Sequence, residues 1–199
     1  MIKLKELVDN NVFSPLCPTE EVGLIFESPV RIKSWVDNNL HSIGKNLAFT
    51  KIIKEKYKAV DTFDGYEIYK NALGKVNYDY FIVGDYIKAM FVYAEHNDGK
   101  IFIEEKVWQD GLNIGLCRKI VFDYYLKKYD AIISDQSHSD LGESYWKHLV
   151  KDAKTKGYKT SVLNTKTNTK VEINVEDMDQ YWSENEKTHF IYRFVIEKT

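Results

Sequence analysis

Two stretches of sequence decide the fold: KIFIEEKVWQDGLNIGLCRKI, residues 100–120, and AIISDQSHSDLGESYWKHL, residues 131–149. In the first, apolar residues alternate from Ile101 to Val107, which predicts a strand, and a loop with two glycines then precedes helical spacing. In the second, the apolar run at residues 131–134 is typical of a short strand buried on both faces, and a helix follows from Gly142. Together they predict strand, glycine loop, helix, buried strand and helix.

The chain before these stretches predicts two amphipathic helices and an antiparallel meander. Ser28-Pro29 is typical of a helix start, and apolar spacing continues that helix to Gly44. A second helix is expected at about residues 46–60. The period then changes to two in segments that end at the hairpin signal Asn97-Asp98-Gly99. The strands expected before this turn are residues 66–72, 78–83 and 87–93.

Three further strand-like segments follow the last helix, which Gly157 ends. They are YKTSVLN at residues 158–164, residues 171–175 and residues 189–197. Residues 1–27 are expected to be irregular because Pro15 and Pro18 interrupt any long element. We therefore predict an α+β fold with a single domain over residues 28–199.

The composition limits the classes of function. The 199 residues are 44% hydrophobic with a net charge of -2, which argues against a protein held on nucleic acid by bulk charge. Apolar runs are too short to span a membrane, and the charged start MIKLKELVDNN is unlike a signal peptide, so we expect a cytoplasmic protein without a membrane partner. Cys17 and Cys117 form no disulfide or metal motif, and Cys117 is expected to be a buried thiol on a helix. Lys, Asn and Tyr are abundant, which suggests an AT-rich genome such as that of a phage or a low-GC bacterium.

The element order and the two quoted stretches resemble the GCN5-related N-acetyltransferase (GNAT) fold, particularly its divergent phage forms. The resemblance covers roughly residues 30–198. It implies a GNAT-like mixed, mainly antiparallel central sheet, splayed in the middle, with helices on both faces. It also implies an acyl-CoA-dependent N-acyltransferase that moves an acetyl group from acetyl-CoA to an amine by direct transfer.

In that family, the loop between the last meander strand and the next helix binds the pyrophosphate of acetyl-CoA. The first turn of a helix has unpaired N–H groups and a partial positive charge, and glycines let the backbone approach an anion. The resemblance places acetyl-CoA against the backbone of Val107, Asp110, Gly111, Leu112, Asn113, Ile114 and Gly115. The family pattern, Arg/Gln-x-x-Gly-x-Gly/Ala, puts Gly115 at its last position, Asn113 at the central glycine and Asp110 at the Arg or Gln. The alternative is an ordinary turn from strand to helix.

Transfer to an amine needs a base, and often an acid for the departing thiolate. By resemblance the base is Glu104 or Glu105, and strand alternation directs only one of them toward the site. Glu105 shares a face with Ile103 and Val107, so we expect Glu105 on the apolar side with a raised pKa.

The family's acid is a Tyr on the helix after the splayed strand. Trp146 stands at that position, and Tyr145 lies one residue earlier, about 100° away around the helix. Trp146 is equally explained as part of a core face with Leu149, Val150 and Ala153. Ser134, at the end of the buried strand, is a further site candidate. A basic run, formed by Lys147, Lys151, Lys154, Lys156 and Lys159, is either a solvated face or a phosphate or nucleic-acid contact.

Three functions stay open at this point. The first is the N-acyltransferase, with a small-molecule or protein amine as acceptor and, for a phage protein, the host cytoplasm as its location. The second is a catalytically silent GNAT-like protein that binds a host or virion protein. The third, nucleobase modification on the same fold, needs a basic groove that the composition does not indicate. No His spacing indicates a metal site.

Overall fold

The computed structural model describes residues 40–97, 99–112, 114–135, 140–182 and 191–199. The chain divides into two compact units, of which the first is Met1–Val92 with Val107–Ile114 and the second is Tyr93–Lys106 with Gly115–Thr199. Strands β4 (Tyr86–His96) and β5 (Ile101–Gln109) contribute residues to both units. Whether the chain is a single domain stays a prediction.

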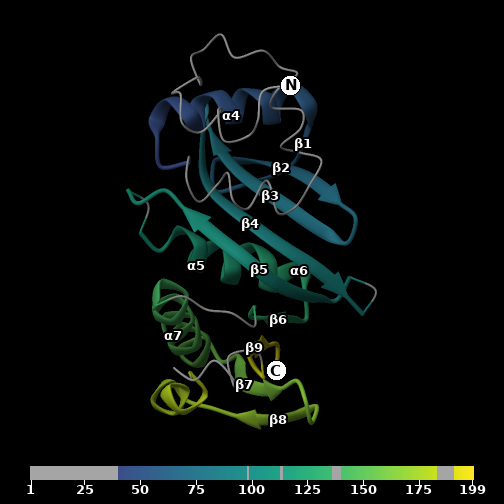
Figure 1. The fold of residues 1–199 in the computed structure, drawn as a ribbon, viewed down its shortest axis with the longest axis vertical. Helices are drawn as coiled ribbons and strands as arrows, with labels where there is room; N and C mark the ends of the chain where they lie inside the picture. Colours follow the sequence, from purple (N-terminus) through teal and green to yellow (C-terminus); the bar gives the residue numbers. More distant parts are fainter. Residues whose placement is uncertain (1–39, 98, 113, 136–139, 183–190) are drawn as a thin grey trace, which may run out of the picture. The chain divides into compact units, whose positions relative to one another are not determined.

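The first unit combines one helix with a meander. Its elements are α4 (Ile43–Lys56), β1 (Ala59–Phe63), β2 (Tyr66–Leu73), β3 (Val76–Val83), the start of β4 and the end of β5, and its strands lie in that order (Figure 1). β2 pairs antiparallel with both β1 and β3. The β1–β2 turn is a two-residue hairpin loop in which Asp64 and Gly65 both have positive φ, 51° and 82°. Such a turn matches the right-handed twist of the flanking strands.

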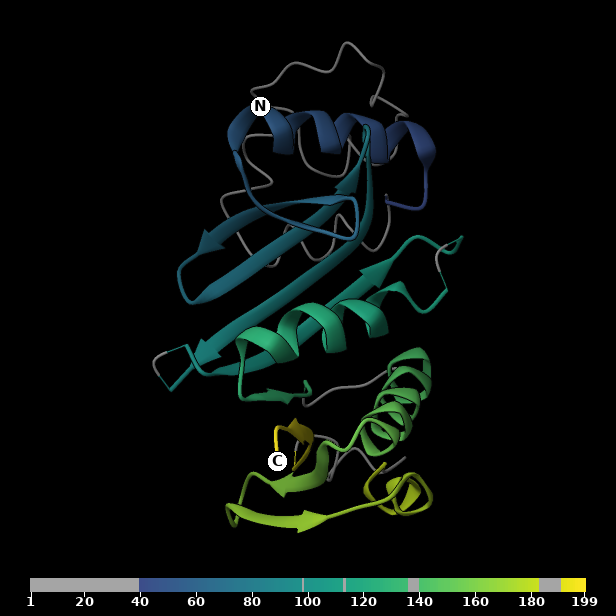
Figure 2. The same ribbon diagram turned by 180° about the vertical axis from the view of Figure 1, so that it is seen from behind.

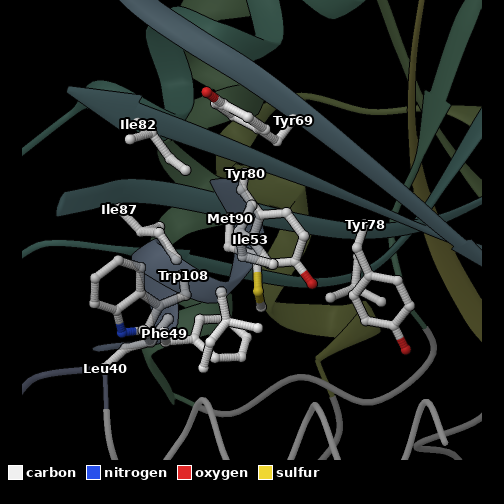
Figure 3. Packing of buried hydrophobic residues seen from close by; sticks show 12 residues of the cluster. Leu40, Phe49, Ile53, Tyr69, Tyr78, Tyr80, Ile82, Ile87, Met90 and Trp108 are labelled. Carbon is white, nitrogen blue, oxygen red and sulfur yellow. The ribbon is translucent and has the colours of Figure 1, made fainter. Parts of the chain in front are cut away.

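Helix α4 buries one face against the meander (Figure 3). The Phe49 ring meets the Tyr80 ring edge-on at 6.0 Å, and Ile53 is completely buried in the same cluster. A buried side-chain amide also fixes how the helix is oriented against the strands. Asn46 Nδ2 donates to the Leu40 and Ile87 carbonyls at 3.3 and 3.1 Å, while Asn46 Oδ1 accepts the Ile87 N–H at 2.9 Å. The amide therefore joins the helix to the start of β4 without leaving those backbone groups unpaired.

The second unit continues the chain from the end of β4 and the start of β5. A helical segment follows, made of α5 (Leu116–Ile120), the π-helical turn η2 (Val121–Tyr125) and α6 (Leu126–Lys128). Next come β6 (Ala131–Ile133), α7 (Asp140–Thr155), β7 (Lys159–Asn164), β8 (Thr169–Glu172), the 3-10 helix η3 (Val175–Tyr181) and β9 (Tyr192–Glu197). The strands of this unit lie in the order β4-β5-β6-β9-β7-β8. β5 and β6 are parallel, whereas β6–β9, β7–β9 and β7–β8 are antiparallel.

Aromatic side chains form much of the core of the second unit. The segment that starts at Leu116 runs along β5 in both views (Figures 1 and 2), and the ring of Tyr125 lies 4.5 Å from that of Phe102. On α7 the buried residues are those predicted as a core face: Trp146, Leu149, Val150 and Ala153. Trp146 stacks on Phe194 of β9 with their rings 6.3 Å apart. Helix α7 is thereby fixed against the strand that separates β6 from β7.

The α+β class and the mixed, mainly antiparallel sheet are confirmed, including the strand–loop–helix–strand–helix order with a parallel β5–β6 pair that a GNAT-like fold implies. The second helix ends at Lys56 rather than near Val60, because Val60 belongs to β1, a strand that the sequence analysis missed. The strand expected at residues 171–175 corresponds to β8, which begins two residues earlier and ends at Glu172. The helix expected from Ser28 lies largely outside the described residues. Among the described residues, no helix is long and apolar enough to cross a membrane.

Candidate active site

The candidate site lies in the second unit, where β5 and β6 stop pairing. Their parallel register covers three residue pairs and ends with Ile103 opposite Ile133. Ser134, the residue after β6, continues the contact with β9, because its N–H donates to the Phe194 carbonyl at 2.8 Å. Glu104 is therefore the first residue of β5 beyond the pairing with β6.

Glu104 is the carboxylate on the buried side of β5. It is 5% exposed, and the other buried residues of the strand are Phe102 and Trp108, at the same parity. Glu105 is half-buried, as are Ile103 and Val107. The expectation that Glu105 occupies the apolar face is therefore wrong. The cause is that the large aromatic side chains, rather than Ile103 and Val107, determine which side of β5 faces the core.

Two adjacent residues of α7 hold the Glu104 carboxyl group. Trp146 Nε1 donates to Oε1 at 3.1 Å, and the Tyr145 hydroxyl donates to Oε2 at a longer 3.4 Å. Trp146 is buried on the core face of the helix, while Tyr145 is half-buried. Their positions, about 100° apart around the helix, bring the two side chains to different oxygens of one carboxyl.

This environment raises the pKa of Glu104 from 4.5 to about 8. Burial is the main cause, because a carboxylate is poorly solvated away from water. The negative charge of Asp135 raises the pKa further, whereas the hydrogen bonds from Trp146 and Tyr145 lower it by stabilising the ionised form. At neutral pH the carboxyl is mostly protonated, but it can exchange a proton within the ordinary pH range.

The groups around Glu104 are themselves perturbed. Burial raises the pKa of the Tyr145 hydroxyl well above 10.0; the Glu104 charge adds to the rise, and Arg118 opposes it. Burial also raises the pKa of the Cys117 thiol well above 9.0, with a smaller contribution from Glu104. Cys117 is buried as predicted. Its thiol is protonated near neutral pH and is a poor nucleophile.

A hollow of about 240 Å³ lies beside the helical segment that begins at Leu116. Its lining contains three cationic side chains, two carboxylates, an aromatic ring and the glycine at the helix start: Arg118, Lys119, Lys156, Asp123, Asp152, Phe122 and Gly115. Arg118 Nη1 contacts Asp152 Oδ2 at 2.9 Å, and Lys156 Nζ lies 5.4 Å from the centre of the Phe122 ring. Gly115 has φ +86°, a conformation that L side chains rarely adopt, and a Cβ there would lie 3.4 Å from the Arg118 guanidinium. The hollow combines positive charge with a helix start that requires glycine.

The remaining residues of the predicted acetyl-CoA loop belong to the first unit. Val107 is half-buried, Gly111, Leu112 and Ile114 are exposed, and Asn113 lies outside the described residues. Asp110 does not carry an unbalanced charge. Lys88 Nζ contacts its carboxylate at 2.9 Å, and this hydrogen bond holds the pKa of Asp110 below its usual value.

Ser134 lies near the site but has a structural hydrogen-bonding pattern. Its hydroxyl accepts the Phe194 N–H at 2.9 Å and donates to the Asp135 carbonyl at 2.8 Å. Both bonds join the end of β6 to its surroundings and use the Ser134 hydroxyl as a donor and as an acceptor. Among the described residues, no group of His, Cys, Asp and Glu side chains could hold a metal ion.

Three features of the site went unrecognised in the sequence. The inward direction of Glu104 was signalled by Phe102 and Trp108 at the same parity. The sequence places Trp146 on a core face or at the position of the family's acid, although an indole N–H is also a good donor to a buried carboxyl. The hollow has weaker sequence signals, since Arg118 and Lys156 are separated by 38 positions, 156 minus 118.

No protein-family model matches the chain, and no curated protein matches it in sequence. Among solved structures, a GNAT family acetyltransferase from Elizabethkingia anophelis with acetyl-CoA bound matches 67% of this chain and 97% of its own. The two chains are 10% identical, with a TM-score of 0.37. At that distance the likeness establishes neither an activity nor a ligand for this chain, and the fold assignment depends on the strand order described above.

Proposed function

We propose that the chain is an acyl-CoA-dependent N-acyltransferase that moves an acetyl group from acetyl-CoA to an amine by direct transfer. The observation that carries the proposal is the buried Glu104 carboxyl, held by Trp146 and Tyr145 where β5 leaves β6. Burial of an ionisable group without an opposite charge costs stability. A cost of this kind is typical of acid–base sites, where a shifted pKa is useful.

The two titratable residues match the two proton transfers of the reaction. In its ionised form Glu104 accepts a proton from the attacking amine, and Tyr145 donates a proton to the departing sulfur. With a pKa of about 8, roughly a tenth of Glu104 is ionised at pH 7. Activity should therefore rise with pH and level off above pH 8. The chain otherwise contributes by holding the thioester carbonyl beside the amine.

The residues around the hollow suit an acyl-CoA. Lys119 and Lys156 are exposed cations that can pair with phosphate groups, whereas Arg118, the third cation of the lining, is half-buried and pairs with Asp152. Gly115 leaves the helix start open to an anion. Acetyl-CoA would supply the activated acyl group. With acyl-CoA bound at the hollow, Lys156 of the predicted basic run would contact a phosphate, whereas Lys147 and Lys154 pair with carboxylates.

The second candidate is a catalytically silent GNAT-like protein that binds a host or virion protein. Two observations favour it: Trp146 stands where the family has its acid, and Asp110 stands where the family has Arg or Gln. The Lys88–Asp110 pair neutralises the latter charge but does not replace a phosphate-binding cation.

Calorimetric titration with acetyl-CoA tests the proposal. Gly115→Glu is the blocking variant, and Gly44→Glu is the matched control, because Gly44 is exposed on α4 with nothing near the position of a Cβ. Micromolar binding by the wild type and the control, lost in Gly115→Glu, is the expected result. No binding at millimolar acetyl-CoA would reject the transferase and favour the binding protein.

A further inference from the structure

The two oxygens of the Glu104 carboxyl have chemically different partners. Oε1 faces the Trp146 indole N–H, which can only donate a hydrogen bond. Oε2 faces the Tyr145 hydroxyl, which can donate or accept. When Glu104 is protonated, a proton on Oε1 would face the indole hydrogen. The proton is therefore carried by Oε2.

We propose that Glu104 and Tyr145 act as one proton relay, and that Trp146 is a positioning residue that keeps Oε1 out of proton transfer. This inference rests on the proposed function. It assigns Trp146 the role of an orienting donor, although a tryptophan cannot supply the proton that the family's tyrosine supplies.

The relay conserves the proton through one reaction cycle. With Glu104 ionised, the Tyr145 O–H donates to Oε2. As the amine nitrogen bonds to the thioester carbonyl carbon, its proton passes to Oε2, and the C–S bond then breaks with its electron pair moving to sulfur. The Oε2–H now donates to the Tyr145 oxygen, which turns the tyrosine hydrogen toward the sulfur. Tyr145 gives that hydrogen to the sulfur as a proton and takes the proton from Oε2, so Glu104 is ionised again.

Burial and packing support a proton exchange shielded from water. Glu104 is 5% exposed, and burial is the main cause of the raised pKa of the Tyr145 hydroxyl, so the polar ends of both side chains lie away from water. The 3.4 Å separation is long for a hydrogen bond between oxygens, and such contacts often shorten when substrate binds. The stack of Trp146 on Phe194 holds the indole in place.

Other ionisable groups act on the same pair from two further segments. Asp135, after β6, disfavours the charge on Glu104, and Cys117 and Arg118, on α5, act on Tyr145. The hydrogen bonds described for the Glu104 carboxyl come from Tyr145 and Trp146, both on α7. The two side chains of α7 therefore determine which oxygen of Glu104 carries the proton.

The test is a pH titration by ¹³C NMR of full-length protein labelled at Glu Cδ and Tyr Cζ. Glu104→Gln and Tyr145→Phe assign the two resonances. In the wild type, Glu104 should titrate near pH 8, and Tyr145 should show a step at the same midpoint because its hydrogen bond reverses. Trp146→Phe keeps an aromatic ring but removes the donor; it should raise the Glu104 midpoint by about one pH unit and weaken the Tyr145 step.

Trp182→Phe is the matched control, because Trp182 also stacks on Phe194, at 4.5 Å, but is not one of the two hydrogen-bond donors to Glu104. It should leave both midpoints unchanged. An unchanged Glu104 midpoint in Trp146→Phe, or a wild-type Tyr145 signal without a step at the Glu104 midpoint, would overturn the relay. The second criterion needs only wild-type protein, so it holds even if Trp146→Phe fails to fold. Coupled titration in a chain that never consumes acetyl-CoA would support the relay geometry and contradict the proposed function.

Discussion

Replacing Glu104 by Gln should change how the stability of the protein depends on pH. The substitution keeps the shape of the side chain and both of its hydrogen-bond partners but removes the titrating group. Because the pKa is raised from 4.5 to about 8, the folded protein keeps a proton between these values that the unfolded chain has released. The stability contributed by this group is therefore fully present below pH 4.5 and is lost as the pH rises through 8. The loss is roughly 1.4 kcal/mol per pH unit, or about 4 kcal/mol between pH 5 and pH 8.

Urea unfolding at pH 5, 6, 7 and 8 measures this effect as the difference between the variant and the wild type. The two proteins should be similar at pH 5, and Glu104→Gln should be more stable by about 4 kcal/mol at pH 8. Contributions from all other groups cancel in the difference. Glu105→Gln is the matched control on the same strand, at a half-buried position, and should show no comparable gain. Parallel stability curves for Glu104→Gln and the wild type would refute the claim that Glu104 is buried as a neutral acid.

Three further predictions concern positions in both units. Asn46→Ala removes the amide's hydrogen bonds to the Ile87 N–H and carbonyl, although Thr50 Oγ1 also accepts that N–H at 3.2 Å, and should lower the free energy of unfolding by about 1–3 kcal/mol; a loss close to zero in urea unfolding would contradict the bridging role of the amide. Gly115→Ala places a side chain on a residue with φ +86° and should lower the free energy of unfolding by at least about 1 kcal/mol in the same assay. An unchanged midpoint would argue against the left-handed backbone conformation of Gly115. In a Cys17→Ser background, Cys117 should react with iodoacetamide at pH 8 at least roughly tenfold more slowly in the native protein than in urea; equal rates would show that the thiol is accessible.

The class of fold could be predicted because the periodicity of apolar residues and the positions of turn residues are local properties of the sequence. The alternation along β4 and β5 and the turn at Asn97 and Gly99 define the hairpin without any long-range information. β1 was missed because the helical spacing of α4 runs on into Val60, although Asp64-Gly65 was a hairpin signal of the same kind. The end of α4 is decided by the pairing of β1 with β2, which is a tertiary contact.

The site could be predicted only in part. Glu104 and Tyr145 were both candidates, but their contact joins residues 41 positions apart and depends on how α7 is rotated against β5. The choice between Glu104 and Glu105 failed because two alternating sets of apolar residues compete on β5. Burial follows the larger side chains, Phe102 and Trp108, since they remove more apolar area from water.

The proposed function requires the Glu104 carboxyl to take part in acyl transfer. Its most direct test is the rate of CoA release from acetyl-CoA with a panel of amines, measured from pH 6 to pH 10 for the wild type and for Glu104→Gln. We expect a wild-type rate that rises with pH and levels off above about pH 8, and a variant that is at least roughly a hundredfold slower across the range. Amine-dependent release that is equal in the two proteins, or no release with any amine, would contradict it.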